Sequence, residues 1–320
     1  MKILITGGAG FIGSHLAEKL LKEGHSVTIL DDLSTGDTKN IQHLIDAKKI
    51  LFKKGDVMRR EDVTPLVKKA DFIFHLAAAV GVKTVVDKPL ESMMRNIEGT
   101  KNVIEEAEKR GVPILITSSS EVYGNSDDLP FREHSDRVYG SAYNERWGYA
   151  LSKAVDEFMA LAYWREKKLP TITVRLFNTT GPRQTHKFGM VIPNFVHRAI
   201  SNEPIIVHGD GEQVRAFSHV VDVVSGMIGL MNSKAAYGEI FNLGSIEAIS
   251  INDLAKKVIK HSGSTSPISY VPYHEAYNAT FEDMRKRVPD ISKIQNMIGY
   301  KPQYTLDDTI ISIIDHYRSI

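Results

Sequence analysis

The sequence predicts an α/β fold built on a doubly wound parallel sheet. Short apolar runs such as Ile3–Ile5 and residues 71–75 lack polar alternation, which is typical of strands buried on both faces. Stretches with apolar residues at helical spacing separate these runs. A glycine-rich turn joins the first run to the first helix. Strands that alternate with helices form a parallel sheet whose sites lie at the carboxyl ends of the strands.

The glycine turn has the spacing Gly7-x-x-Gly10-x-x-Gly13. This spacing places one glycine at a tight turn, one where the backbone approaches a pyrophosphate, and one where the helix packs on the strand. The free N–H groups at the helix N-terminus then face the phosphates. Phe11 and Ile12 lie within the turn and are expected to border the same cofactor.

The second strand, Ser26–Leu30, ends at Asp31, about where an acidic residue should meet an adenosine ribose. A carboxylate at Asp31 accepts a hydrogen bond from a 2′-hydroxyl and repels a 2′-phosphate. Because no arginine directly follows Asp31, the sequence favours NAD over NADP as the cofactor. The alternative is a glycine turn that serves packing alone.

The composition excludes several classes of protein. The 320 residues suggest one large domain or two joined ones, and 40 Lys and Arg against 39 Asp and Glu give no sign of a nucleic-acid partner. No segment approaches the ~20 apolar residues of a membrane span, and the chain opens on a predicted strand rather than a signal peptide. The sequence has no cysteine, which excludes disulfides and thiolate metal sites. We predict a cytoplasmic enzyme with no metal.

Further cofactor contacts are predicted after the next two strands. The strand Ile50–Phe52 leads to Asp56, which is placed to meet adenine. The strand at 71–75 leads into a turn of small residues, where a cofactor can lie close to the backbone. We interpret His75 as a packed residue at the strand end and not as a base. The residues expected to border the cofactor here are Asp56, Val57, Leu76, Ala77 and Ala78.

A candidate proton-transfer pair follows the strand Pro113–Thr117. That strand opens into a serine-rich loop where a nicotinamide ring would lie. Tyr149 and Lys153 come later on a predicted helix and, being four residues apart, share one face. Tyrosine is a poor base at its usual pKa of about 10, but an adjacent ammonium favours the phenolate and moves the pKa toward neutral. The alternative is a surface pair beside an ordinary loop.

A smaller second domain is predicted after the strand Thr171–Phe177, where alternation becomes irregular. The helix that ends at Met231 and the run Glu239–Gly244 look like a return to the sheet. We therefore predict a cofactor-binding domain at residues 1–178, joined again by about 217–245. An interleaved C-terminal substrate domain would comprise residues 179–216 and 246–320.

These motifs occur in the order found in the extended short-chain dehydrogenase/reductases, and the chain resembles a nucleotide-sugar epimerase/dehydratase of that superfamily over essentially its whole length. The motifs are the glycine turn, Asp31, the turn 75–78, the serine loop, Tyr149 with Lys153, and Leu176-Phe177-Asn178-x-x-Gly181-Pro182-Arg183. The resemblance implies a Rossmann-type fold and a tightly held NAD⁺.

The resemblance also implies catalytic roles. NAD⁺ would take a hydride from a sugar carbon, usually C4. Tyr149 as phenolate would take the hydroxyl proton, and Lys153 would bind the nicotinamide ribose and hold the phenolate charge. Ser119 would hydrogen-bond the O4 oxygen, with Ser120 beside it.

A UDP-sugar substrate and a homodimer are implied as well. Arg215 and Arg287 would bind the diphosphate, because guanidinium forks suit anionic oxygens. Asn178 would donate nearby. The segment 190–193, which includes Val191, and the strand 205–207 would bracket the base. In relatives the helices corresponding to residues 96–103 and 149–163 pair across a two-fold axis.

The residue at the position of Glu121 differs between the families that catalyse the candidate reactions. Its motif Ser-Glu-Val-Tyr-Gly resembles UDP-glucuronate decarboxylases and 4,6-dehydratases, whereas UDP-glucose 4-epimerases often have a small or neutral residue there. Dehydratases usually place an aspartate at the position of Ser120, which disfavours dehydration here. The stretch 181–190 resembles bacterial epimerases, including those of UDP-glucuronate. Its residues Arg183, Thr185, His186 and Lys187 could receive a C6 carboxylate or simply cap a loop.

The sequence thus favours an NAD-dependent 4-epimerase of UDP-glucose or UDP-glucuronate over a UDP-glucuronate decarboxylase. A 4,6-dehydratase is less favoured. Because fold does not fix function, a non-catalytic dinucleotide-binding regulator is the alternative from a different class.

Overall fold

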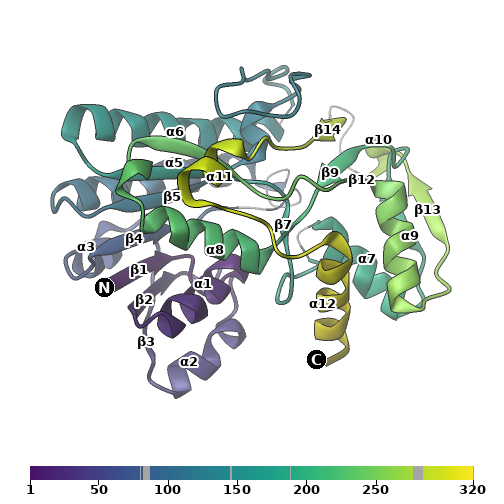
Figure 1. Ribbon diagram of the computed structural model, residues 1–320, viewed down its shortest axis with the longest axis horizontal. Coiled ribbons are helices and arrows are strands. Elements are labelled where there is room, and N and C mark those ends of the chain that lie inside the picture. The colour runs from purple at the N-terminus through teal and green to yellow at the C-terminus, as the bar shows by residue number, and fades with distance from the viewer. Residues whose placement is uncertain (80, 82–86, 145, 188, 277–283, 320) are drawn as a thin grey trace.

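The structure contains the predicted doubly wound parallel sheet, which has seven strands (Figure 1). The computed structural model describes residues 1–79, 81, 87–144, 146–187, 189–276 and 284–319. All neighbouring strands of this sheet are parallel. In sheet order the strands are β11 (Glu239–Leu243), β6 (Thr171–Leu176), β5 (Ile114–Ser119), β4 (Phe72–His75), β1 (Lys2–Thr6), β2 (Ser26–Asp31) and β3 (Ile50–Lys54).

The strand order reverses at β1, which lies between β2 and β4. At the carboxyl end of this pairing Thr6 lies opposite His75, and in the β5–β6 pair Ser119 lies opposite Leu176. The glycine turn, the turn at 76–78 and the serine loop therefore leave the sheet at one edge. A reversal of strand order at such an edge is where open α/β sheets bind ligands.

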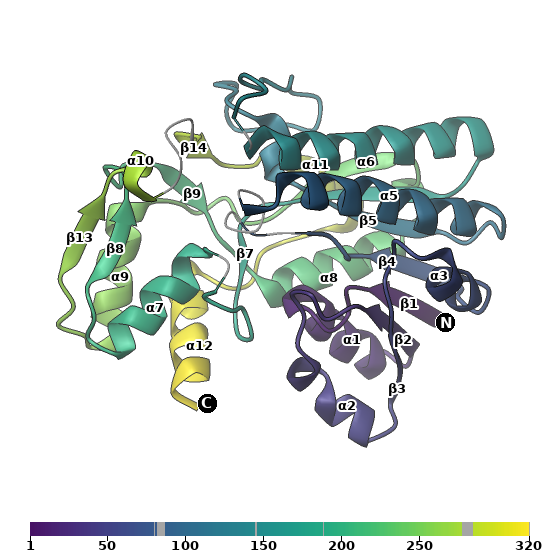
Figure 2. The same cartoon turned by 180° about the vertical axis from the view of Figure 1, so that it is seen from behind.

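Helices cover both faces of the sheet, as Figures 1 and 2 show. Ile3 and Ile5 of β1 pack into one core and Leu4 packs into the other, as the alternation of side chains along a strand requires. The core around Leu4 contains α3 (Arg60–Val67), α5 (Pro89–Glu108) and α6 (Arg146–Lys167). The core around Ile3 and Ile5 contains α1 (Phe11–Lys22), α8 (Val220–Met231) and α11 (Ser292–Ile298).

A separate, smaller core lies to one side of the sheet (Figure 1). One of its helices, α9, has stabilising residues at both ends. Ser250 caps its first turn by accepting a hydrogen bond from Asp253 N, and the helix ends at Gly263 in the left-handed conformation. The elements of this core are α7 (Val191–Ile200), α9 (Ile251–Ser262), α12 (Leu306–Ser319), β8 (Ile205–His208) and β13 (Ile268–Val271).

Several short elements complete the fold, and some of the short strands pair with one another outside the large sheet. The remaining elements are η1 (Thr38–Asn40), α2 (Gln42–Asp46), η2 (Ser120–Tyr123), β7 (Thr179–Thr180), β9 (Val214–Ala216), β10 (Ser218–His219), η3 (Lys234–Ala236), β12 (Ala248–Ser250), α10 (Tyr273–Ala276) and β14 (Lys286–Arg287). β9 pairs with β12 and β14, and β7 pairs with β10. Within the described residues, we find no helix with the length and apolar character needed to cross a membrane.

One expected boundary differs in the structure. Residues after 246 were expected in the substrate domain, but Ile291, Ile294 and Tyr300 pack in the core around Ile3 and Ile5. α11 lies against α8 and β11. The segment between this stretch and the terminal helix, residues 301–305, contains few apolar positions. The sequence pattern therefore does not show that the stretch returns to the large sheet.

A buried ion pair between Glu157 and Arg175 holds the serine loop by hydrogen bonds to its side chains. Glu157 of α6 accepts hydrogen bonds from Nε and Nη2 of Arg175 at 2.9 and 2.7 Å, and from the hydroxyl of Ser118 at 2.6 Å. Arg137 also binds Glu157. Arg175 in turn donates to the hydroxyl of Tyr123 at 2.8 Å. Since Glu157 is 0% exposed, the loop from Ser118 to Tyr123 is tied to charges inside the protein.

Glu157→Gln should lower the free energy of unfolding by about 3–5 kcal/mol, because Arg175 would stay buried without its counter-charge. Urea denaturation measures this change. Glu91→Gln is the control, since it removes a surface pair with Lys88 in which both side chains are more than half exposed. That change should be within about 1 kcal/mol. Equal small losses in the two variants would contradict the role given to the buried pair.

Candidate active site

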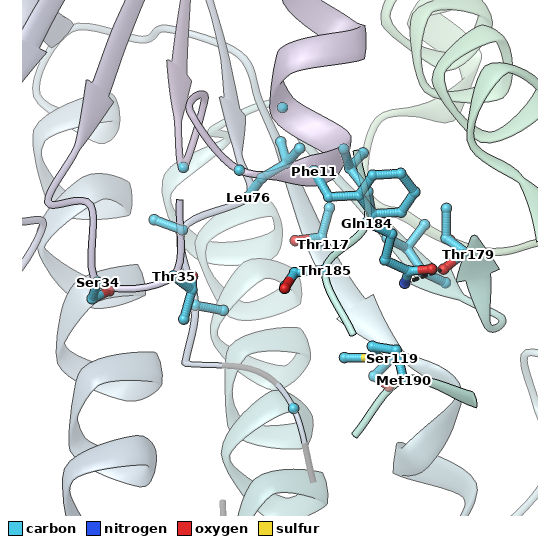
Figure 3. Close-up of a pocket in the computed structure, with 18 of the residues that line it drawn as sticks. Phe11, Ser34, Thr35, Leu76, Thr117, Ser119, Thr179, Gln184, Thr185 and Met190 are labelled. Atoms are coloured by element: carbon cyan, nitrogen blue, oxygen red, sulfur yellow. Dashed lines mark hydrogen bonds between the residues drawn. The ribbon is translucent and has the colours of Figure 1, made fainter. Parts of the chain in front are cut away.

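A continuous cleft of about 550 Å³ runs along the carboxyl edge of the sheet. Every predicted site residue except Arg215 lines it. Figure 3 shows it from Ser34 and Thr35 on one side to Ser119 and Met190 on the other, with the side chain of Gln184 bound to the carbonyl of Thr179. The cleft therefore brings together residues from both predicted domains.

The glycine turn is packed too tightly for larger residues. Gly7 has φ 74°, and a Cβ there would lie 2.7 Å from Ala77 N. A Cβ on Gly13 would lie 2.3 Å from the carbonyl oxygen of Gly7. No side chain caps the first turn of α1, whose N-cap is Gly10. The turn thus leaves backbone N–H groups facing the cleft, which fits a pyrophosphate.

Asp31 lies at the end of β2 on the wall of the cleft. Its two carboxylate oxygens accept hydrogen bonds from Ala9 N at 2.9 Å and from Leu33 N at 2.8 Å. Burial raises the pKa of this carboxyl group, and these two N–H groups oppose the increase. The arrangement fixes the carboxylate against the glycine turn, where it can also accept from a ribose hydroxyl.

Arg95 is a cleft residue that the sequence analysis missed. It projects from α5 to Asp32, and its Nη1 lies 3.3 Å from Oδ1 of Asp56. Asp56 also accepts from Met58 N at 3.0 Å. The region expected to hold adenine is therefore bordered by one guanidinium group that binds two carboxylates. The arginine lies 39 residues from Asp56, so no local sequence signal relates the two.

Tyr149 and Lys153 lie on the cleft side of α6, as their spacing predicts. Lys153 favours the phenolate as expected, but the net direction of the pKa shift of Tyr149 differs from the expectation. Burial raises the pKa of the Tyr149 phenol above its usual value, Lys153 opposes this, Glu121 adds to it and the Ser119 hydroxyl opposes it. The prediction of a lowered pKa is thus wrong, because the effect of burial is larger than that of Lys153. The spacing of residues on a helix shows that Lys153 lies near Tyr149. It does not show the burial of the phenol, which has the larger effect on its pKa.

Glu121 is bound by two arginines. It accepts from Nε and Nη2 of Arg146 at 3.1 and 3.0 Å, and Arg287 also binds it. Arg146 is a second residue that the sequence analysis missed, although it precedes Tyr149 by three positions and so shares its helical face. This wall of the cleft therefore carries two guanidinium groups that are held by one carboxylate.

Asn178 and Arg287 contact each other at 2.7 Å. The amide nitrogen of Asn178, expected to donate to a diphosphate, donates to the carbonyl of Ala216 at 2.8 Å. Arg215 is buried on β9 opposite Arg287, and donates to the carbonyl of Val214 at 2.9 Å. Arg215 therefore lies beside Arg287 but not on the wall of the cleft.

The side chain of Arg183 is bound by residues on the cofactor side of the cleft. Its guanidinium binds Glu18 of α1 at 2.9 and 3.0 Å and reaches Nδ1 of His15 at 2.8 Å. Burial, and then the charge of Arg183, lower the pKa of His15 to about 4, so the neutral ring can accept this bond. Arg183, one of the four residues expected to receive a C6 carboxylate, is thus already paired. Glu18 lies 165 residues away, which no local motif reveals.

The segment 190–193 lines the cleft at the start of α7, and Val191 lies in it. The strand β8, expected to bracket the base from the other side, is not among the residues that line the cleft. Ser119 and Ser120 lie at the end of β5, and Ser120 is almost fully buried. Among the described residues, no cluster of three or more His, Asp or Glu is placed to hold a metal ion.

Comparisons with known proteins agree with this geometry. Residues 4–313 match the GDP-mannose 4,6-dehydratase family. The UDP-N-acetyl-α-D-glucosaminuronate decarboxylase of Bacillus cytotoxicus is 38% identical over 320 residues, which cover 100% of this chain and 98% of the relative. The UDP-glucuronic acid decarboxylase 1 of Xenopus tropicalis is 34% identical over 99% of this chain and 72% of its own length.

Solved structures match the whole chain. The UDP-glucose 4-epimerase of Thermotoga maritima, with UDP-glucose, superposes with a TM-score of 0.90 at 28% identity and covers 100% of this chain and 99% of the other. The UDP-glucuronic acid 4-epimerase of Bacillus cereus, with UDP-glucuronic acid and NAD, gives 0.89 at 27% identity over the same shares. These likenesses confirm the predicted fold class.

Proposed function

The chain belongs to the GDP-mannose 4,6-dehydratase family of the extended short-chain dehydrogenase/reductases, and from this premise we propose that it is an NAD-dependent decarboxylase of a UDP-hexuronate. The candidate substrates are UDP-glucuronate and its 2-acetamido counterpart, after the two relatives named above. The observation that carries the proposal is the pair of arginines around Glu121, beside the tyrosine and serine expected to act on C4.

The cofactor side of the cleft fits NAD⁺. Gly7, Gly10 and Gly13 would hold the pyrophosphate, Asp31 the adenosine ribose and Lys153 the nicotinamide ribose. When bound, NAD⁺ supplies a reversible hydride acceptor for C4 of a sugar. The carboxylate of Asp31 opposes a 2′-phosphate and so favours NAD over NADP.

The chain's own residues manage the proton at O4. Tyr149 takes the hydroxyl proton, and Ser119 donates to the same oxygen. Since burial raises the pKa of Tyr149, positive charge near the ring is needed to make the phenolate accessible. Lys153 provides such a charge from the same helix face.

A ketone at C4 turns a hexuronate into a β-keto acid. Its C5–C6 bond then breaks, carbon dioxide leaves, and the enolate that remains takes a proton at C5. The C4 ketone would then take the hydride back from the reduced cofactor, which would give the UDP-pentose and restore NAD⁺. Arg146 and Arg287 place positive charge on the wall of the cleft where a carboxylate or an enolate would otherwise be unfavourable in a partly buried site. Glu121 holds both guanidinium groups on that wall.

The same geometry weakens the case for a UDP-glucuronate epimerase, which the sequence analysis favoured. Such an enzyme must keep the C6 carboxylate in an orientation that disfavours bond cleavage, and the loop from Arg183 to Lys187 was expected to do so. In that loop the guanidinium of Arg183 is bound by Glu18 and His15. The relatives of 38% and 34% identity carry the names of decarboxylases.

A UDP-sugar 4-epimerase is the second candidate. Two epimerases of known structure superpose along the whole chain, and their 28% and 27% identity does not favour one reaction over the other. Ser119, Tyr149 and Lys153 would serve either reaction. The difference lies in whether C6 is a carboxylate and whether it is lost.

We also propose a homodimer formed through α5 and α6, which lie side by side in both views (Figures 1 and 2). Several apolar side chains on these two helices are exposed: Leu90 (73%), Met94 (40%), Leu151 (42%), Val155 (41%) and Phe158 (66%). A second copy of the chain would remove them from water. A cytoplasmic location stays a prediction.

Turnover of UDP-sugars tests the reaction. With UDP-glucuronate or its 2-acetamido counterpart, the enzyme should release one carbon dioxide per sugar and give a UDP-pentose, resolved by mass. Tyr149→Phe should reduce the rate by ~10²–10⁴ while the fold is kept, because a general base is worth about that much. A C4 epimer of unchanged mass would make epimerisation the function, and rates near wild type in Tyr149→Phe would exclude Tyr149 as the base.

Asp31→Ala should weaken NAD binding and reduce the preference for NAD over NADP, because the variant loses both the ribose hydrogen bond and the repulsion of a 2′-phosphate. Calorimetric titration with each cofactor measures the two affinities. Asp46→Ala, on α2 outside the cleft, is the control. An unchanged preference in Asp31→Ala would remove this carboxylate from the cofactor site.

Leu151→Arg combined with Val155→Arg should convert the dimer into a monomer, because two charges would be buried at the interface. Light scattering after size exclusion measures the mass. Leu51→Arg replaces a leucine that is 55% exposed on β3 and should leave the dimer intact. A dimer that survives in the double variant would place the interface elsewhere.

A further inference from the structure

Asp156 forms a buried ion pair with the lysine of the proton-transfer pair. Its Oδ2 accepts a hydrogen bond from Nζ of Lys153 at 2.8 Å, and the two side chains are 0% and 3% exposed. The residues lie three apart on α6, so the pair forms within one turn of helix. Asp156 does not line the cleft and therefore acts on the site through Lys153.

Other buried carboxylates near the site are compensated differently. Glu121 is bound by Arg146 and Arg287, and Glu157 by Arg175 and Arg137. Each of these carboxylates thus has two guanidinium partners. The charge of Asp156 is instead set against the ammonium that also faces Tyr149.

The elements packed against this pair add polar groups. Burial raises the pKa of Asp156, whereas the charge of Lys153 and, from α5, the hydroxyl of Thr100 favour its ionised form. The same hydroxyl lies 3.1 Å from Nε2 of His75 on β4, whose Nδ1 lies 2.7 Å from the hydroxyl of Thr6 on β1. Burial, and then the charge of Lys153, lower the pKa of His75 to about 3, so this imidazole is neutral.

The chain of polar groups ends inside the protein, because Thr6 is 0% exposed. It therefore does not reach solvent through Thr6, and Asp156 is held by the hydrogen bond from Lys153. Burial lowers the pKa of Lys153, but the charges of Asp156 and Tyr149 outweigh it and leave the pKa raised. Lys153 thus stays an ammonium.

We propose that Asp156 is a positioning residue that fixes the ammonium of Lys153 beneath the catalytic phenol and offsets part of its charge, and so sets the pH range in which Tyr149 works. The inference rests on the proposed function only in taking Tyr149 as the base. Besides Asp156, the charged groups that act on Tyr149 include Lys153 from the same helix and Glu121 from η2, and Glu121 is itself bound by Arg146 and Arg287.

The sign of the effect follows from the charges. The negative charge of Asp156 raises the pKa of Tyr149, and the positive charge of Lys153 lowers it. Asparagine at position 156 can still accept a hydrogen bond from Lys153 but carries no charge. Lys153 then acts on the phenol with its full charge, and the pKa of Tyr149 falls.

A tyrosinate titration tests this directly. The ultraviolet absorbance of each protein is measured as a function of pH with NAD⁺ bound. Subtracting the absorbance of the same protein with Tyr149→Phe leaves the contribution of Tyr149. Asp156→Asn should lower the pKa of Tyr149 by about one unit, on the order expected for one charge removed within a partly buried site. The acidic limb of kcat/KM should move down by the same amount, with KM little changed. The titration needs no turnover, so it remains informative if the proposed reaction is wrong.

Glu106→Gln is the matched control. Glu106 of α5 is also a buried carboxylate bound to a lysine three residues away, Lys109, but it lies outside the cleft. This variant makes the same change in net charge and should leave the pKa of Tyr149 unchanged. If Asp156→Asn does not fold, Asp156→Ser removes the same charge and should give the same shift. An unchanged pKa of Tyr149 in a folded variant at position 156, or an equal shift in Glu106→Gln, would overturn the proposal.

Discussion

Parallel pairing of β1 with both β2 and β4 is the constraint on which the site depends. The pairing puts Thr6 opposite His75, so that the glycine turn and the turn at 76–78 leave the sheet together. They are packed closely enough that a Cβ on Gly7 would lie 2.7 Å from Ala77 N. Loops from β5 and β6 emerge along the same edge, and this brings the serine loop and Asn178 to the cleft.

Features that depend on local spacing could be predicted from the sequence. The strand, turn and helix around Gly7, the carboxylate at Asp31 and the shared face of Tyr149 and Lys153 all follow from rules that span a few residues. Long-range partners could not be predicted this way. Glu18, which binds Arg183, lies 165 residues from it, and Glu121 lies 25 residues from Arg146.

The electrostatic errors have the same origin. The residue spacing of α6 shows that Lys153 lies near Tyr149, but it does not show the burial that raises the pKa of Tyr149. The carboxylate of Asp156 was visible three residues after Lys153, on the same helical face, and could have been recognised as its partner. The arginines at Glu121 come from a helix start and a distant short strand, so their convergence needed the fold. That convergence shifts the preferred function from epimerisation to decarboxylation.

The source of the hydrogen at C5 of the product tests the central claim most directly. Decarboxylation replaces the C5–C6 bond with a bond from C5 to a proton taken from solvent, whereas epimerisation at C4 leaves C5 untouched. The reaction is run in deuterium oxide with UDP-glucuronate, and the product is analysed by proton NMR and mass. The account predicts a UDP-pentose with one deuterium at C5. A hexuronate product with no deuterium at C5 would contradict it.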